Sequence, residues 1–279
     1  MTATQTAPGG HDDGEGGSGR HAATDTLERP QRSRADVVRL VARGVGQTLI
    51  TGGLVILLFV VYEVWVTNLF ASAKQNDVHQ QFQTLLDQPT VGSSQLPLPG
   101  TAQKTIPAGQ GIANLYIPTF GSDYNYTVVE GVDDADLEKG PGHYSGTALP
   151  GQEGNFSVAG HRVGKGEPFL NLDQLKPGDA VVVQVPGYWY VYKVLGQDGD
   201  IAKPDANGVV GRQIVSPTDV AVIAPTPDKA DAGASGDYMT MTTCHPKYSA
   251  NQRMVVHAIL AETKPAAGDA IPTELGGTL

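Results

Sequence analysis

The sequence predicts a mainly β domain preceded by one transmembrane helix. One long apolar run lies near the N-terminus, and the rest of the apolar residues fall in short segments rich in Val, Ile, Tyr and Thr. These segments are bounded by Gly, Pro, Asn or Asp, which is typical of strands. Eight such strands with little helix between them predict one closed β-barrel or a sandwich.

Residues 1–43 are expected to form a disordered cytoplasmic tail. The stretch is rich in Gly, Asp and Thr, and its first 36 residues hold almost no large apolar side chain. Such a composition cannot bury enough surface to fold.

Residues 44–70 are expected to be a transmembrane anchor. The run TLITGGLVILLFVVYEVWVTNLF spans 48–70, and a hydrocarbon core needs about 20 residues. The run is longer than the apolar core of a signal peptide, and no A-x-A cleavage site follows it closely. A carboxylate is costly at mid-bilayer, so we place Glu63 near the outer interface beside Trp65.

The charges beside this run predict its orientation. Before it lie Arg32, Arg34, Arg39 and Arg43, and just after it lies Lys74. The positive-inside rule then places the N-terminus in the cytoplasm and residues 71–279 outside, in a single-pass protein of the cell membrane.

Residues 71–107 are expected to be a stalk that begins as a helix and continues as a Pro- and Gly-rich segment. The helix is indicated by the spacing of Val78, Phe82, Leu85 and Leu86. The body of the protein is then 108–264, and 265–279 is expected to be a flexible tail.

The body supplies the candidate strands. They are 114–120, 126–131, 154–160, 180–186, 188–195, 220–224, 237–244 and 253–260. One helical turn is expected at 170–175, followed by a turn at 176–179.

The acidic charge of the chain bears on its partners. The formal net charge is −10, so nucleic acid is not an expected partner. Four carboxylates gather in one loop, at Asp133, Asp134, Asp136 and Glu138. We expect a solvated loop there, with a cation site left open, and we predict neither a metal requirement nor a cofactor.

Cys244 is the only cysteine of the chain. A single cysteine outside the membrane cannot form an internal disulfide, and its thiol is open to oxidation. Spacing and composition leave two alternatives, a nucleophile or a buried filler, because context decides reactivity.

A cysteine nucleophile needs an acid or base partner. The histidines after the span are His79, His143, His161, His245 and His257. His79 belongs to the stalk, and His245 is the strand neighbour of Cys244 and points to the other face. His257 lies four residues beyond Arg253, about 13 Å along a strand. His143, in a loop, and His161, at the end of a predicted strand, remain, and His161 is the better placed.

Arg253 follows Cys244 by nine positions. An arginine at a strand end is often only solvated. Its fixed charge and several donors are also what a tetrahedral oxyanion or an extended peptide requires. The residues by themselves therefore allow a membrane-anchored cysteine acyl-transfer enzyme.

Several segments in order resemble the sortase family, most closely the class E sortases of actinobacteria. They are NLYIPTFG (114–121), LEKGPGHYSGTALPGQEGNFSVAGHR (137–162), PFLNLDQLKPGDAVVV (168–183), VSPTDVAVIAPTP (215–227), TMTTC (240–244) and HPKYSANQRMVVHA (245–258). TMTTC fits the family's T-L-x-T-C signature with Met241 in the leucine position, a volume-conserving change. The likeness covers nearly all of 112–262.

The resemblance implies an eight-stranded sortase β-barrel with short helices and a cysteine transpeptidase. By position, Cys244 matches the nucleophile, His161 the general acid and base, and Arg253 the group that orients substrate and oxyanion. Thr243 and Thr242 match the oxyanion and substrate-binding positions.

The resemblance also implies the substrates. The family cuts a C-terminal sorting signal between Thr and Gly and passes the acyl group to a peptidoglycan amine, from a precursor or cross-bridge. Class E members are associated with L-A-x-T-G rather than L-P-x-T-G, a preference linked to a tyrosine near the groove. Tyr116 and Tyr124 are both candidates. No DPW- or DPF-like lid motif precedes the barrel, which favours anchoring of surface proteins over pilin polymerisation.

Two other classes of protein remain to be weighed. An L,D-transpeptidase would have histidine and glycine just before the cysteine, and a papain-like peptidase would have its cysteine at a helix start; TMTTC on a strand fits neither. A non-enzymatic adhesion barrel with an inert cysteine is the other alternative, and alkylation of the native thiol separates it.

Overall fold

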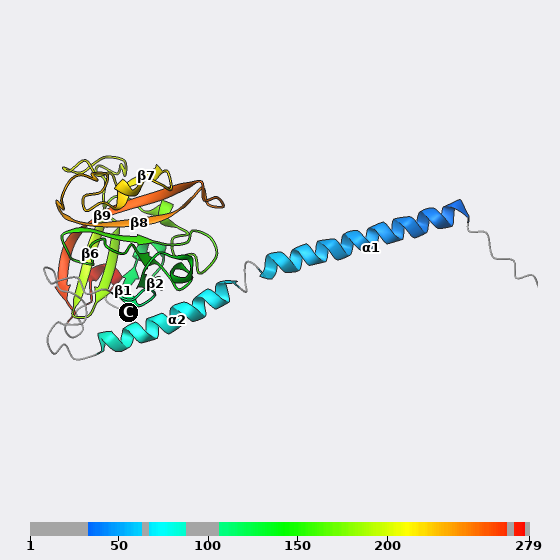
Figure 1. The fold of residues 1–279 in the computed structure, drawn as a ribbon, viewed down its shortest axis with the longest axis horizontal. Coiled ribbons are helices and arrows are strands. Elements are labelled where there is room, and N and C mark those ends of the chain that lie inside the picture. The colour runs from blue at the N-terminus through cyan, green and yellow to red at the C-terminus, as the bar shows by residue number, and fades with distance from the viewer. Residues whose placement is uncertain (1–32, 63–66, 88–105, 267–270, 277–279) are drawn as a thin grey trace, which may run out of the picture. The chain divides into compact units, whose positions relative to one another are not determined.

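The fold described here comes from a computed structural model of the 279-residue chain. The structure describes residues 33–62, 67–87, 106–266 and 271–276 (Figure 1). Most of the expected cytoplasmic tail, the Pro- and Gly-rich part of the expected stalk, and both Glu63 and Trp65 lie outside these residues.

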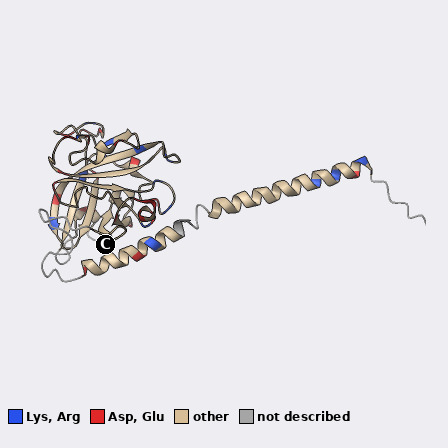
Figure 2. Ribbon diagram, in the orientation of Figure 1, with Lys and Arg blue, Asp and Glu red and all other residues tan. Residues whose placement is uncertain are grey.

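The first described helix, α1 (Arg34–Val61), is long and apolar enough to cross a membrane by its length and composition. It begins before the expected boundary at residue 44 and includes the basic flank. The charged residues of α1 all lie in its first part (Figure 2). The hydroxyls of Thr48 and Thr51 donate to the carbonyls of Gly44 and Gln47 within the helix. These bonds satisfy the two hydroxyls without water, as an apolar surrounding requires.

The body is a closed β-barrel, as the sequence predicts. Its strands are β1 (Gly111–Tyr116), β2 (Asn125–Glu130), β3 (Gly142–His143), β4 (Gly154–Ala159), β5 (Ala180–Val185), β6 (Tyr188–Val194), β7 (Arg212–Val215), β8 (Asp237–His245) and β9 (Gln252–Pro265). In the described residues, eight of them close a ring in the order β6-β5-β1-β2-β3-β4-β8-β9, with β9 pairing back to β6. β7 adds to β9 outside this ring.

The length of β9 makes this closure possible. Its 14 residues are twice the length of β6. The first part of β9 pairs with β8 on one side and β7 on the other, and its later part pairs with β6. One long strand therefore joins the two ends of the sheet.

The barrel interior is an apolar core built by alternation along the strands. On β8, Met239 and Met241 are fully buried in this core, while Thr240 and Thr242, which alternate with them, point to the other face. Met241 thus fills a core position, as expected for a residue in place of leucine.

Some elements differ from the sequence-based expectation. The predicted strand 220–224 is wrong: Val220–Ile223 form a single turn of 3₁₀ helix, in which the Asp219 carboxylate accepts from Ala221 N. Pro217 and Pro225 flank this turn and Val220 is 71% exposed, so no strand pairing is available to it. The strands β3 and β7 were not expected, and β1 ends at Tyr116 because Pro118 begins another 3₁₀ turn.

The helix expected at the start of the stalk is α2 (Thr67–Leu86), and it packs against β1 and β2 of the barrel (Figure 1). Ala71, Val78 and Phe82 are buried in this contact. A Cβ at Gly111 would lie 3.2 Å from Val78 Cγ1 and 3.3 Å from Phe82 Cβ. Glycine at this position therefore lets the helix come close to the strand. α2 belongs to the folded body rather than standing apart from it.

The described end of the chain also packs on the barrel. Ala266 and Leu275 cover an outer cluster that includes Tyr116 and Trp189. Lys193 Nζ forms an ion pair with Glu274 Oε1 at 3.2 Å. The described part of the C-terminal segment is thus fixed to the outer face of β5 and β6, where a flexible tail was expected.

The acidic loop forms the short helix α3 (Asp134–Leu137), and acidic positions are grouped in red on this part of the ribbon in Figure 2. Asp136 is 6% exposed and pairs with Lys139 at 3.4 Å. Glu138, just after the helix, pairs with Lys74 of α2 at 2.5 Å and with Lys165 at 3.3 Å. In the described residues, no group of three or more His, Cys, Asp or Glu side chains is arranged to hold a metal ion.

Candidate active site

The candidate site lies where β4 and β8 end side by side. The two strands are parallel neighbours, paired from Gly154↔Asp237 to Ala159↔Thr242. Gly160 N adds a hydrogen bond to Thr242 O at 3.0 Å. Because parallel strands finish at the same edge of a sheet, His161 and Cys244 come to the same end of the barrel.

Cys244 is a free, partly exposed cysteine, and its partner across the β8–β9 ladder is Arg253. Directly opposed residues of an antiparallel pair have Cβ atoms about 5 Å apart on one face. Arg253 Nη1 donates to the carbonyls of Ala250 at 2.9 Å and Gln252 at 3.1 Å. These two bonds anchor one amino group of the guanidinium to the start of β9 and to the loop just before it.

His161 is half-buried just past the end of β4. Burial lowers the pKa of its imidazole, and the nearby Lys165 cation lowers the pKa further, while Asp134 and Glu138 act in the opposite direction. His161 Nε2 is buried without a hydrogen-bond partner among the described residues. No hydrogen bond within the described residues therefore commits the proton or the lone pair of this nitrogen.

Two tyrosines hold the loop that follows His161. Tyr124 OH donates to Pro168 O at 2.8 Å, and Tyr126 OH donates to Gly166 O at 2.6 Å. Burial raises the pKa of both phenols, which keeps them neutral donors. Tyr124 therefore reaches the histidine loop.

Tyr116, the other tyrosine expected near the groove, lies elsewhere. Its ring packs on Trp189 with centroids 5.8 Å apart, and its hydroxyl donates to Gln184 Oε1 at 3.1 Å. Burial raises the pKa of Tyr116 to about 12. Together with the cover from the C-terminal segment, these contacts place Tyr116 on the outer face of β1 and β5, in a different cluster from the barrel interior.

The two threonines before Cys244 have different neighbours. Thr243 Oγ1 donates to Gly160 O at 2.7 Å. Thr242 Oγ1 lies 2.9 Å from Tyr144 OH. Thr243 thus ties the cysteine strand to the residue before His161, while Thr242 shares its hydrogen bond with a tyrosine that the sequence analysis did not single out.

Arg162 is a second residue of the site that the sequence analysis did not single out. It is 4% exposed. Its Nη2 forms an ion pair with Asp173 Oδ2 at 3.1 Å, and its Nη1 lies 3.0 Å from His245 Nδ1. The segment quoted for the resemblance ends at Arg162, but no pattern of charge or spacing distinguishes a buried arginine from a solvated one.

His143, the rejected alternative to His161, is fully engaged in the barrel wall. Nδ1 lies 2.7 Å from Glu130 Oε2, and Nε2 lies 3.1 Å from Ala148 O and 3.0 Å from Thr147 Oγ1. Thr147 gives its own proton to Tyr144 O, so both imidazole nitrogens face acceptors. His143 is therefore occupied as a donor to a buried carboxylate and a carbonyl, which suits a structural role.

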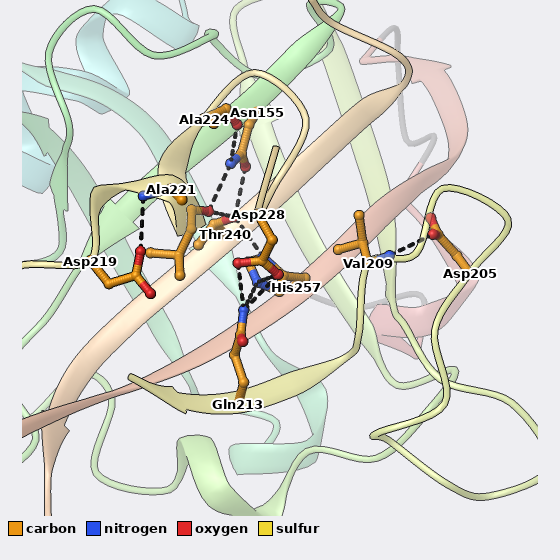
Figure 3. A network of polar contacts seen from close by, with 11 residues as sticks. Asn155, Asp205, Val209, Gln213, Asp219, Ala221, Ala224, Asp228, Thr240 and His257 are labelled. Atoms are coloured by element: carbon orange, nitrogen blue, oxygen red, sulfur yellow. Dashed lines mark hydrogen bonds and ion pairs between the residues drawn. The ribbon is translucent and has the colours of Figure 1, made fainter. Parts of the chain in front are cut away.

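His257 is buried in a separate polar network on β9 (Figure 3). Nδ1 lies 2.9 Å from Thr240 Oγ1 and Nε2 lies 3.2 Å from Gln213 Nε2. Burial lowers the pKa of His257 to about 3. His79 of α2 is likewise engaged, with Nδ1 2.9 Å from Thr127 Oγ1 on β2.

Comparison with known proteins identifies the family to which the chain belongs. A family model described as the sortase domain matches residues 115–261, which is more than half of the chain. The chain belongs to the sortase family. Sortases are cysteine transpeptidases that anchor proteins to the cell wall, and they act on proteins bearing a sorting signal and on a cell-wall amine.

Two curated sortases of Streptomyces coelicolor are similar over most of the chain. Sortase SrtE2 is 32% identical over 278 residues, which is 98% of each chain. Sortase SrtE1 is 34% identical over 245 residues, covering 85% of this chain and 62% of that relative. The class E assignment expected from the motifs is thus confirmed.

Solved sortase structures share the fold. The SrtF sortase from Corynebacterium diphtheriae is 42% identical with a TM-score of 0.55, covering 64% of this chain and 98% of that one. Sortase E from Streptomyces avermitilis is 36% identical with a TM-score of 0.50, covering 61% of this chain and 99% of that one. The sortase barrel expected from the sequence is confirmed.

Proposed function

We propose that this sortase is anchored in the cell membrane by α1 and cleaves a C-terminal sorting signal between Thr and Gly. We propose L-A-x-T-G as the preferred signal, with L-P-x-T-G as the alternative. The meeting of Cys244, His161 and Arg253 at one end of the barrel carries this proposal. We call Cys244 and His161 the catalytic pair.

The first half-reaction forms a thioester. The thiolate of Cys244 attacks the threonine carbonyl carbon, and the developing oxyanion is stabilised by the Arg253 guanidinium and donors near Thr243. The carbon–nitrogen bond to glycine then breaks. The imidazolium of His161 gives its Nε2 proton to the departing amine, so the leaving group departs neutral.

The second half-reaction releases the acyl group to the cell wall. A peptidoglycan amine attacks the thioester carbonyl and loses a proton to the neutral His161. The carbon–sulfur bond breaks, a new amide forms, and Cys244 leaves as thiolate. The enzyme regains its starting protonation state without a cofactor.

The lowered pKa of His161 has a consequence for this cycle. The acid step needs imidazolium and the base step needs neutral imidazole, and burial together with Lys165 favours the neutral form. This bias keeps the neutral form populated for the second half-reaction, and it makes the imidazolium that the first half-reaction needs less populated but a stronger acid.

The similarity to SrtE1 and SrtE2 supports the class E signal and the anchoring role. For the tyrosine linked to this preference, the contact of Tyr124 with the histidine loop favours it over Tyr116. We propose an inward N-terminus and an outward barrel from the basic flank of α1.

Intact-mass spectrometry tests the proposal directly. The 279-residue chain in detergent is mixed with L-A-x-T-G or L-P-x-T-G peptide, without and with an amine acceptor. We expect a mass increase equal to the peptide up to its threonine, mapped to Cys244 and removed by the amine. Relative yields decide the signal. A folded protein whose thiol labels with iodoacetamide but forms no adduct would point to another acyl substrate.

A further inference from the structure

Two hydrogen bonds surround the catalytic pair. The residues immediately before His161 and Cys244 are joined by the bond from Thr243 Oγ1 to Gly160 O, at 2.7 Å. The residues immediately after them are joined by the contact of Arg162 Nη1 with His245 Nδ1, at 3.0 Å. The catalytic histidine and cysteine are thus flanked on both sides by contacts between their own neighbours.

The second contact lies beyond the regular pairing of the two strands. The ladder between β4 and β8 ends at Ala159↔Thr242. After that position the chain of β4 turns away into the loop that Tyr124 and Tyr126 hold. The Arg162–His245 contact therefore joins the strand ends where backbone ladder bonds have stopped.

Arg162 is held from two sides, which makes it a rigid link. One amino group of its guanidinium pairs with Asp173 Oδ2 at 3.1 Å, and the other points at His245. The Arg162 side chain is 4% exposed, so bulk water solvates its charge poorly, and the Asp173 carboxylate compensates the charge instead. A guanidinium has only donors, so His245 Nδ1 is the acceptor in this contact.

We propose that Arg162 and His245 are positioning residues that fix the separation of the catalytic pair. This inference rests on the proposed function, because the two residues act only through the positions of Cys244 and His161. The Arg162–His245 contact holds the His161 imidazole and the Cys244 thiol within reach of one substrate carbonyl. Misplacement of reacting groups by about 1 Å is enough to cost on the order of 100-fold in rate.

The test exploits the partial exposure of His245, which makes its substitution tolerable to folding. His245→Leu removes the acceptor, whereas His245→Asn, which has nearly the shape of leucine, places its side-chain carbonyl Oδ1 where Nδ1 lies in the histidine. We expect His245→Leu to lower kcat by about tenfold or more with KM nearly unchanged. We expect His245→Asn to recover most of that loss. Unfolding temperatures of both variants are measured alongside.

A double-mutant cycle with Arg162→Met tests whether the two residues act through each other. If they do, the double variant Arg162→Met/His245→Leu loses no more in kcat than the worse single variant. If Arg162→Met does not fold, the paired His245 variants still decide. Equal kcat for His245→Leu and wild type overturns the proposal, and so does an equal loss in His245→Asn and His245→Leu.

Cys244→Ala, measured in parallel, separates this inference from the function on which it rests. Thioester formation retained in Cys244→Ala would remove the catalytic pair itself. An inactive Cys244→Ala together with fully active His245→Leu would remove only the positioning role.

Discussion

Cys244 on β8 and Arg253 on β9 are directly paired residues of one antiparallel ladder, so their side chains leave the sheet on the same face. The relationship is fixed by backbone hydrogen bonds rather than by flexible side chains. A change in the chemistry of the cation therefore leaves its position intact.

Replacing the Arg253 guanidinium with a lysine amine, which has fewer hydrogen-bond donors, should lower the reaction rate. We expect Arg253→Lys to reduce the rate of thioester formation by about 100-fold or more, because the planar fork of donors is lost while the charge remains. Intact-mass kinetics measures the rate. Arg212→Lys on the neighbouring strand β7 is the matched control and should keep nearly the wild-type rate; equal losses in both variants would remove the special role of Arg253.

His143 and His161 should respond differently to substitution. His143→Ala removes the histidine partner of the buried Glu130 carboxylate and leaves it the hydrogen bond with Ser145, so we expect the free energy of unfolding to fall by about 3 kcal/mol. Activity per folded molecule should remain close to wild type, whereas His161→Ala should lose orders of magnitude in rate at nearly unchanged stability. Urea unfolding and thioester kinetics give both quantities. A folded, inactive His143→Ala beside an active His161→Ala would reverse our choice of histidine.

Lys165 and Glu138 should shift the His161 pKa in opposite directions. The Lys165 cation lowers this pKa, so Lys165→Met should raise it. The Glu138 carboxylate raises it and pairs with Lys165, so Glu138→Gln should lower it. NMR titration of the His161 ring measures both. Shifts of the same sign in the two variants would contradict this electrostatic account, and the exposed Lys203→Met serves as the neutral control.

His257 should make the barrel sensitive to acid. Its pKa is lowered from 6.5 to about 3 in the folded protein by burial. The unfolded chain therefore binds a proton below about pH 6.5 that the folded protein refuses until about pH 3, so stability is lost as pH falls through this window. The slope is at most about 1.4 kcal/mol per pH unit for one group. Urea unfolding between pH 7 and 5 should show a smaller slope for His257→Gln than for wild type; identical slopes would remove His257 as a cause.

Gly111 should control the docking of α2. Its missing side chain leaves room for Val78 and Phe82, so we expect Gly111→Val to push the helix from β1 and to destabilise the protein by about 2 kcal/mol through overpacking. Gly233→Val is the control for a substituted loop glycine, since a Cβ there meets nothing within 4 Å and the backbone φ is not positive. Thermal unfolding of both variants compares the two effects. No larger loss in Gly111→Val than in Gly233→Val would argue against a tight contact.

The sequence predicts most of the barrel because its core strands are short, β-rich and bounded by turn residues. It failed where tertiary context decides. Val220–Ile223 has strand composition, but a cap and flanking prolines make it a 3₁₀ turn. β3 is two residues long and β7 four, too short for alternation to be seen. Such elements form because the neighbouring strands offer them partners.

In the candidate site, too, some features could be predicted from the sequence and others depend on tertiary context. Motif resemblance singled out Cys244, His161 and Arg253, and the topology brings their strand ends together. Arg162 and Tyr144 were missed because sequence alone cannot tell a buried polar side chain from a solvated one. Conversely, nothing in the spacing of His143 reveals its bond to Glu130, which only the pairing of β2 with β3 creates.

The parallel pairing of β4 with β8 also has a kinetic consequence. The residues it brings together, such as Gly160 and Thr243, are 83 positions apart in the chain. Pairings at such separation close a long loop and are slow to form, whereas β5 and β6 are joined by a two-residue turn and pair locally. In refolding, we therefore expect the spectroscopic signal of locally paired β-structure to develop ahead of transpeptidase activity, because closure of the barrel and assembly of the active site both require the pairing of β4 with β8.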